Sequence, residues 1–194
     1  MVELSKYLYA VFLLSITLLA TAAQAETRVV GGIELAEKID VSNKVMTLNG
    51  AGVRSKFFMD LYVGSLFLST ASSAAAEIIA ADSPMMIQLD IISERITSEN
   101  MTEAILEGFE NSTGDNTQPL QAEINEFMAV FSDAINIGDR FQLIHLPDQG
   151  MLINKNEKQI AQMQKSMAFK QALFGIWLSD KPAQSSLKKG MLGK

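Results

Sequence analysis

The stretch LNGAGVRSKFFMDLYVGSLFL, from Leu48 to Leu68, decides the fold. Its second half, Phe57–Leu68, is apolar at both odd and even positions, which is typical of a β-strand buried on both faces. Its first half continues the segment Lys44–Gly52, where Met46 and Leu48 alternate with polar residues as in a half-buried strand. Two such strands, close in sequence, predict an antiparallel pair within a larger sheet.

The elements on either side of this stretch are a mixture of strands and amphipathic helices. Asn100 and Glu103 are spaced like a helix N-cap and its partner three residues on, followed by an apolar stripe at helical spacing. We expect further strands at 29–35, 85–93, 140–146, 151–155 and near 159–163, and helices at 70–81, 101–109, 120–135, 166–178 and 182–190. Because strands and helices do not alternate as in βαβ units, this order predicts an α+β fold, an antiparallel sheet with helices packed on one face.

The N-terminus has the pattern of an export signal. Lys6 precedes an apolar run from Leu8 to Ala20, and Ala23 and Ala25 then form the Ala-x-Ala pattern of signal peptidase sites. The run is shorter than the roughly 20 residues that span a bilayer, so we expect no stable membrane anchor after cleavage. The prediction is a signal peptide at 1–25 and one domain at 26–194, in a periplasmic or secreted protein.

Composition excludes several kinds of site. The chain has no cysteine and a single histidine, so thiolate metal sites, cysteine nucleophiles and multi-histidine metal sites are excluded. We expect no metal and no cofactor, and we interpret His145, between Ile144 and Leu146, as a packing residue. The net charge of −6 is unfavourable for binding nucleic acid or an anionic membrane surface.

Arg54 is the first candidate site residue. If its strand continues without a bulge, Arg54 shares the face of Met46 and Leu48, where an unpaired charge costs several kcal/mol unless an anion is bound. Glycines within a strand also mark a bulge or a close approach by a backbone or ligand. The alternative is that Arg54 ends the strand in water, beside Asp60 or Asp90.

Tyr62 is the second candidate. It lies in the middle of the doubly buried strand, and a buried phenol needs a hydrogen-bond partner. Adjacent antiparallel strands would bring Arg54 and Tyr62 into one pocket, where a guanidinium and a hydroxyl suit a carboxylate. Ordinary core packing is the alternative for Tyr62.

These residues also carry a family resemblance. The segments LNGAGVR at 48–54 and LYVGSLFL at 61–68 resemble the first core strands of chalcone-isomerase-like proteins. The segment FKQALFGIWLSDKP at 169–182 is similar to the bacterial secreted branch, with Ser179 in place of the usual glycine. The resemblance extends from Arg28 to Gly193 and implies an open-faced sandwich with a ligand cleft between sheet and helices.

The resemblance implies roles for individual residues. Arg54 matches the arginine shared by plant chalcone isomerases and by fatty-acid-binding relatives, and Tyr62 matches a tyrosine of the latter. The region 93–109 contains no tyrosine where the isomerase has one; Thr97, Asn100 and Met101 lie there instead, and we expect these three to line the ligand cleft.

Three hypotheses follow. The first is non-catalytic binding of a fatty acid or similar small apolar acid, whose head group is held by Arg54 and Tyr62. The second is an intramolecular lyase or isomerase acting on an unsaturated ketone of a polyphenol-like ligand. The third is a structural or partner-binding domain that has no small ligand and pairs Arg54 internally with a carboxylate.

Overall fold

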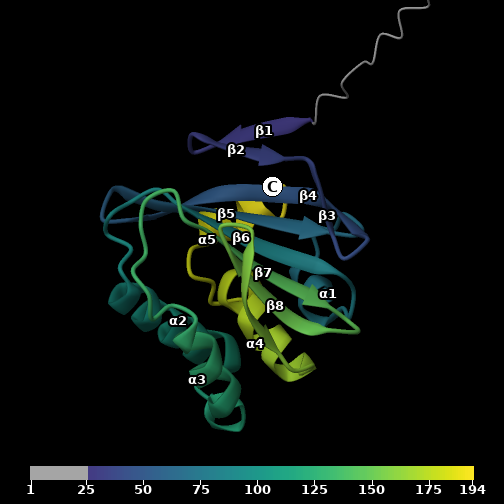
Figure 1. The fold of residues 1–194 in the computed structure, drawn as a ribbon, viewed down its shortest axis with the longest axis vertical. Helices are drawn as coiled ribbons and strands as arrows, with labels where there is room; N and C mark the ends of the chain where they lie inside the picture. Colours follow the sequence, from purple (N-terminus) through teal and green to yellow (C-terminus); the bar gives the residue numbers. More distant parts are fainter. Residues whose placement is uncertain (1–25) are drawn as a thin grey trace, which may run out of the picture.

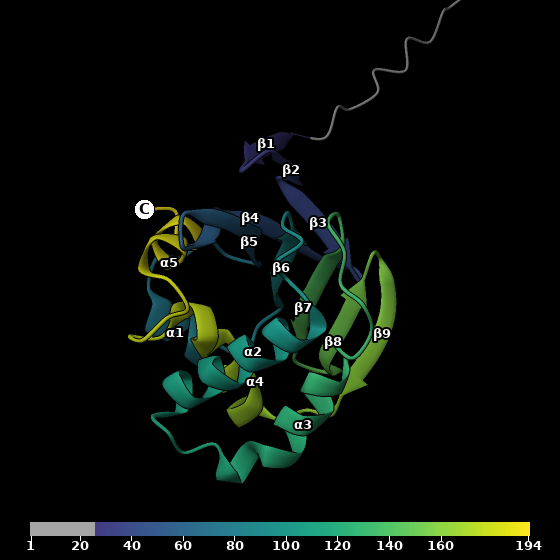
Figure 2. The same cartoon turned by 90° about the vertical axis from the view of Figure 1, so that its left-hand side faces the viewer.

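The structure, a computed structural model, describes residues 26–194, so the predicted signal peptide lies outside the described residues. Its centre is a seven-stranded antiparallel sheet whose strand order follows the chain. The strands are β3 (Lys38–Val41), β4 (Lys44–Lys56), β5 (Met59–Leu68), β6 (Met85–Ile91), β7 (Arg140–Leu146), β8 (Gly150–Lys155) and β9 (Lys158–Met163). The sheet is curled, and helices lie along one of its faces (Figures 1 and 2). The predicted α+β class and layer arrangement are confirmed.

The helices come from three segments of the chain. They are α1 (Ala75–Ala80), α2 (Ser98–Thr113), a 3-10 turn at Gln118–Leu120, α3 (Gln121–Ala129), α4 (Met167–Leu178) and α5 (Ser185–Met191). The most apolar of them, α4, is buried from Phe169 to Leu178 except at Gln171, because it lies between the sheet and the other helices. No helix within 26–194 is long and apolar enough to span a bilayer.

The strand expected at 29–35 is a hairpin instead. Strands β1 (Thr27–Val30) and β2 (Ile33–Ala36) are joined by Gly31 and Gly32, both at positive φ. Two adjacent glycines in that conformation are typical of a two-residue hairpin turn. The hairpin packs through Leu35 against the sheet face opposite the helices.

A β-bulge in β4 decides which face Arg54 occupies. The pairing with β5 shifts between Leu48 and Gly50, so the side chains before and after Asn49 do not keep one alternation. Met46 and Leu48 belong to the core on the hairpin side. Arg54 pairs with Tyr62, which belongs to the core on the helix side. The condition that Arg54 shares the face of Met46 and Leu48 is therefore not met; it lies on the helix-covered face.

The glycines of β4 serve the packing of α5. A Cβ built on Gly50 would lie 2.2 Å from the carbonyl oxygen of Gly190, and one on Gly52 would only reach ordinary contact with Leu187 at 3.4 Å. The backbone of α5 therefore lies directly against the strand. Asn49, the bulged residue, completes the contact by donating from Nδ2 to the Met191 carbonyl at 2.9 Å.

Candidate functional site

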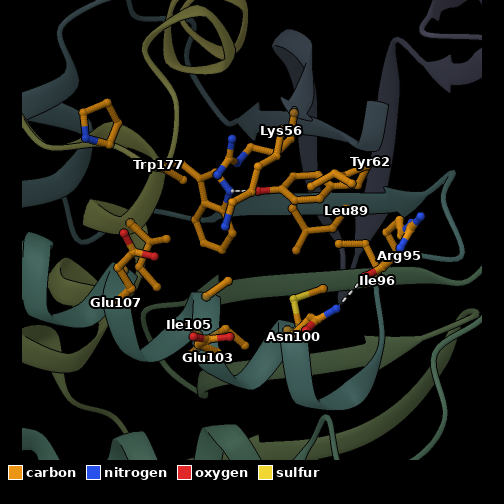
Figure 3. A pocket seen from close by; sticks show the side chains of 18 of the residues that line it. Lys56, Tyr62, Leu89, Arg95, Ile96, Asn100, Glu103, Ile105, Glu107 and Trp177 are labelled. Carbon is orange, nitrogen blue, oxygen red and sulfur yellow. Dashed lines mark hydrogen bonds between the residues drawn. The ribbon is translucent and has the colours of Figure 1, made fainter. Parts of the chain in front are cut away.

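A cavity of about 380 Å³ lies between the helix-side face of the sheet and helices α2 and α4. This volume falls within the range of small-molecule sites. Most of the buried side chains along it are apolar: Leu61, Leu89, Ile96, Met101, Ile105 and Ile176. Polar side chains line it from two sides: β4 and β5 contribute Arg54 and Tyr62. Across the cavity, α2 contributes Asn100, Glu103 and Glu107 (Figure 3).

Arg54 and Tyr62 are direct partners across the β4–β5 ladder, so their side chains project from the same face into the cavity. Opposite residues in an antiparallel pair have their Cβ atoms only about 5 Å apart. The structure thus brings together the two residues that the sequence predicted to share a pocket.

The guanidinium of Arg54 is held by neutral acceptors. Its Nη1 donates to the Ser55 carbonyl at 2.9 Å and to Gln184 Oε1 at 3.0 Å. No carboxylate within residues 26–194 forms an ion pair with it. The two acids considered from sequence are engaged elsewhere, since Asp60 accepts from Ser55 Oγ and Asp90 pairs with Arg140. Arg54 is thus a half-buried cation without an ion-pair partner in the described residues.

Tyr62 is 8% exposed and its hydroxyl oxygen accepts a hydrogen bond of 3.0 Å from Trp177 Nε1 (Figure 3). Burial raises the pKa of Tyr62 above its ordinary value, and the bond from Trp177 and the nearby charge of Arg54 offset only part of that rise. Tyr62 is therefore a neutral phenol at physiological pH. Because its oxygen already accepts from the indole, its own proton is available to donate to a ligand.

The three residues expected at the start of α2 have different positions. Met101 is 5% exposed and lines the cavity. Asn100 lines the cavity from an exposed position, and its Nδ2 donates to the Arg95 carbonyl at 2.9 Å. Thr97 is not a lining residue; its hydroxyl accepts from the Asn100 amide and caps α2. The helix cap predicted at Asn100 is thus three residues earlier in the chain, at Thr97.

Sequence reasoning missed several residues that shape the site. Trp177 and Gln184 hold Tyr62 and Arg54 from the C-terminal part of the chain, and Leu89 and Arg95 line the cavity. Trp177 belongs to the family-like segment at 169–182, but no role was expected for it. For Gln184, at the N-cap of α5, no pattern in the sequence indicates a contact 130 residues away.

His145, interpreted from the sequence as a packing residue, is not among the residues that line the cavity. His145 is 2% exposed on β7, and its Nε2 lies 2.8 Å from Asp82 Oδ1. Burial lowers the pKa of His145 despite that carboxylate, which is consistent with the predicted packing role. Within residues 26–194 no group of three or more histidine, aspartate or glutamate side chains is arranged to hold a metal. The cavity thus presents a cation and a phenol from β4 and β5 and a lining that is apolar in larger part, with Glu103 and Glu107 on α2. A cation and a phenol beside apolar side chains suit a carboxylate with an apolar tail.

Comparison with known proteins agrees with this architecture. A family model described as chalcone isomerase-like matches residues 27–193. Among solved structures, the chain is similar to an Arabidopsis thaliana fatty-acid binding protein, with a TM-score of 0.68 at 14% sequence identity, over 86% of this chain and 96% of that one. No curated protein sequence matches. At this identity, the structural likeness establishes the fold.

Proposed function

The chain belongs to the chalcone isomerase-like family, and from that premise we propose that it binds a fatty acid or similar small apolar acid. Arg54 and Tyr62 would hold the carboxylate, and the apolar lining along β5, β6, α2 and α4 would enclose the tail. The observation that carries the proposal is the Arg54 guanidinium, which lines a mainly apolar cavity and has no ion-pair partner within residues 26–194. A structural neighbour whose title names it a fatty-acid binding protein supports the same ligand class.

The apolar lining and Arg54 would contribute to binding in different ways. Apolar burial at roughly 25 cal/mol per Å² would supply most of the affinity. The charge-assisted bond to Arg54 would fix the orientation of the ligand. Removing it should cost about 1.5–3 kcal/mol, which is about ten- to a hundred-fold in affinity.

The test is a titration of the purified protein with long-chain fatty acids, preceded by solvent extraction and mass spectrometry of whatever it carries. Arg54→Gln should weaken binding at least about ten-fold. The matched control is Arg28→Gln, which removes the same charge from the exposed Arg28–Glu37 pair on the β1–β2 hairpin. A protein that emerges empty, ignores added fatty acids and is indifferent to Arg54→Gln would refute the proposal.

The same variant distinguishes the isomerase alternative. Chalcone turnover, followed by absorbance and abolished in Arg54→Gln, would favour an intramolecular lyase in which Arg54 stabilises developing negative charge. Turnover that persists unchanged in Arg54→Gln would count against that reading.

We also propose that the protein is exported and acts in the periplasm or outside the cell. The proposal rests on the apolar run Leu8–Ala20 and on Ala23 and Ala25. N-terminal sequencing of the protein recovered from the cell envelope should begin at Glu26. Recovery from the cytoplasm with Met1 intact would contradict it.

A further inference from the structure

The turn between β4 and β5 exposes two phenylalanines next to the cavity. Phe57 is 79% exposed and Phe58 107%, although this segment was expected to be the start of a buried strand. That prediction is wrong for residues 57–60: the chain reverses at Phe57 and Phe58, and Met59 and Asp60 are exposed although β5 begins at Met59. Phe57 and Met59 are also lining residues of the cavity, so the apolar tip adjoins the space assigned to the ligand.

The turn is unfavourable for an isolated soluble protein on two counts. Phe57 and Phe58 have φ of 52° and 63°, a left-handed conformation that bulky side chains rarely adopt and that asparagine or glycine normally fills in such turns. Strained residues of this kind cluster at ligand clamps and switch regions. Both rings are exposed, and neither is covered within residues 26–194.

The surroundings indicate what covers the tip. Lys56 and Arg95 line the same cavity as Phe57, and neither cation forms an ion pair within the described part of the chain, although Glu103 and Glu107 of α2 also line it. The Lys56 ammonium lies 5.7 Å from the centre of the Phe57 ring. Aromatic rings at the tip with cations just behind them match the layers of a phospholipid surface, acyl chains below and phosphate oxygens above.

We propose that the β4–β5 tip, Lys56–Met59, docks reversibly on a phospholipid surface and opens the cavity to the lipid from which an apolar acid is taken up. The purpose of the docking rests on the proposed function; the docking itself does not. Every phospholipid carries a phosphate, so anionic lipid is not required, and the net charge of −6 would favour a neutral surface over an anionic one.

The experiment places a fluorescent reporter at the tip. In Phe58→Trp, tryptophan emission should shift to shorter wavelength when phosphatidylcholine vesicles are added to ligand-free protein. In the matched control Val45→Trp, at a 57% exposed position of β4, it should not shift. Co-sedimentation should fall at least about ten-fold in Phe57→Ser/Phe58→Ser, since two rings would no longer be buried. It should be unchanged in Val45→Ser. All variants carry the same N-terminus, so any contribution of residues 1–25 cancels.

Two outcomes overturn the docking, and a third separates it from the proposed function. A folded Phe58→Trp protein that shows no vesicle-dependent shift refutes docking. A shift that appears without vesicles and grows with protein concentration indicates a second copy of the chain on the tip. Vesicle binding without fatty-acid binding would leave the docking in place and refute the proposed function. Fatty-acid binding without vesicle binding would leave the proposed function in place and refute the docking.

Discussion

Arg54 and Tyr62 stand opposite each other on neighbouring strands, and each is held by a residue from the C-terminal part of the chain. Gln184 accepts from Arg54, and Trp177 donates to Tyr62. These holders leave the charge of the guanidinium and the proton of the phenol available to a ligand. The site therefore depends on neutral partners, and exchanging one for a charged residue should disable it without unfolding the protein.

Gln184→Glu should switch off carboxylate binding by supplying an internal counterion. Gln184 Oε1 lies 3.0 Å from Arg54 Nη1 and 2.8 Å from the Ser55 amide nitrogen, and a carboxylate oxygen can accept both bonds. We expect fatty-acid affinity to fall at least about ten-fold while the free energy of unfolding stays the same or rises. Titration and denaturant unfolding of the same preparation measure both.

The control for that substitution is Gln184→Leu, which removes the acceptor without adding charge. It should retain more affinity than Gln184→Glu because Arg54 keeps its full charge. Equal losses in the two variants would mean that the shape of Gln184, and not its neutrality, matters to the ligand.

Trp177 and Tyr62 should show energetic coupling. Trp177→Phe keeps an apolar ring but leaves the Tyr62 oxygen without its donor, and Tyr62→Phe leaves the indole N–H without an acceptor. Each should cost about 1–3 kcal/mol of unfolding free energy, because both groups are buried. The double variant should cost about 1 kcal/mol less than the sum of the two. Strict additivity, measured by urea unfolding, would show that the bond contributes nothing.

The course of the main chain could be predicted well from the sequence because apolar periodicity reflects burial directly. Phe57–Leu68 was expected to be buried on both faces, and every residue from Leu61 to Leu68 is buried. The hairpin of β7 and β8 and the third strand β9 also follow the prediction. By contrast, the turn at Phe57 and Phe58 carries no glycine, asparagine or proline, so nothing local marks it as a reversal.

The site could be predicted only in part. Arg54 and Tyr62 were found because a charge and a phenol within apolar strands are conspicuous. Arg54 was expected on the face of Met46 and Leu48 because side chains of a regular strand alternate between its two faces. The bulge after Leu48 shifts that alternation by one residue, so Arg54 faces the helix-side core and not the hairpin-side core. Gln184 and Trp177 join the site through contacts more than 100 residues apart in sequence, which local patterns do not encode.

The two glycines of β4 should differ sharply in their tolerance of a methyl group. In Gly50→Ala the new Cβ would meet the Gly190 carbonyl at 2.2 Å, and backbone there cannot yield without displacing α5. In Gly52→Ala it would meet Leu187 at 3.4 Å, an ordinary contact. We expect Gly50→Ala to lower the free energy of unfolding by about 2 kcal/mol or more and Gly52→Ala by well under half of that. Similar losses in both would indicate that α5 moves freely on the strand.

Lys170 gives the chain a stability that should rise with pH. It is fully buried in α4, and its Nζ donates to the carbonyls of Ile78, Ile79 and Ala81 at the end of α1. Burial lowers the pKa of Lys170 from 10.5 to about 8, with Asp82 opposing the change. The unfolded chain therefore binds more protons than the folded one between those values, so the free energy of unfolding increases as pH rises through that window.

The variant that isolates this effect is Lys170→Met, which keeps the length of the side chain but cannot titrate or donate to α1. It should be less stable than the parent by about 1–3 kcal/mol at pH 7, because one buried and two part-buried carbonyls lose their donor. The difference in unfolding free energy between the parent and Lys170→Met should widen by at most about 3 kcal/mol as the pH is raised towards 10.5. The raised pKa of Tyr62 affects both proteins equally and cancels in the difference. Denaturant unfolding at several pH values measures that difference. If it narrows with rising pH, the α1 carbonyls bind the ammonium more strongly than water does, and Lys170 is a charged clamp whose contribution is lost at high pH.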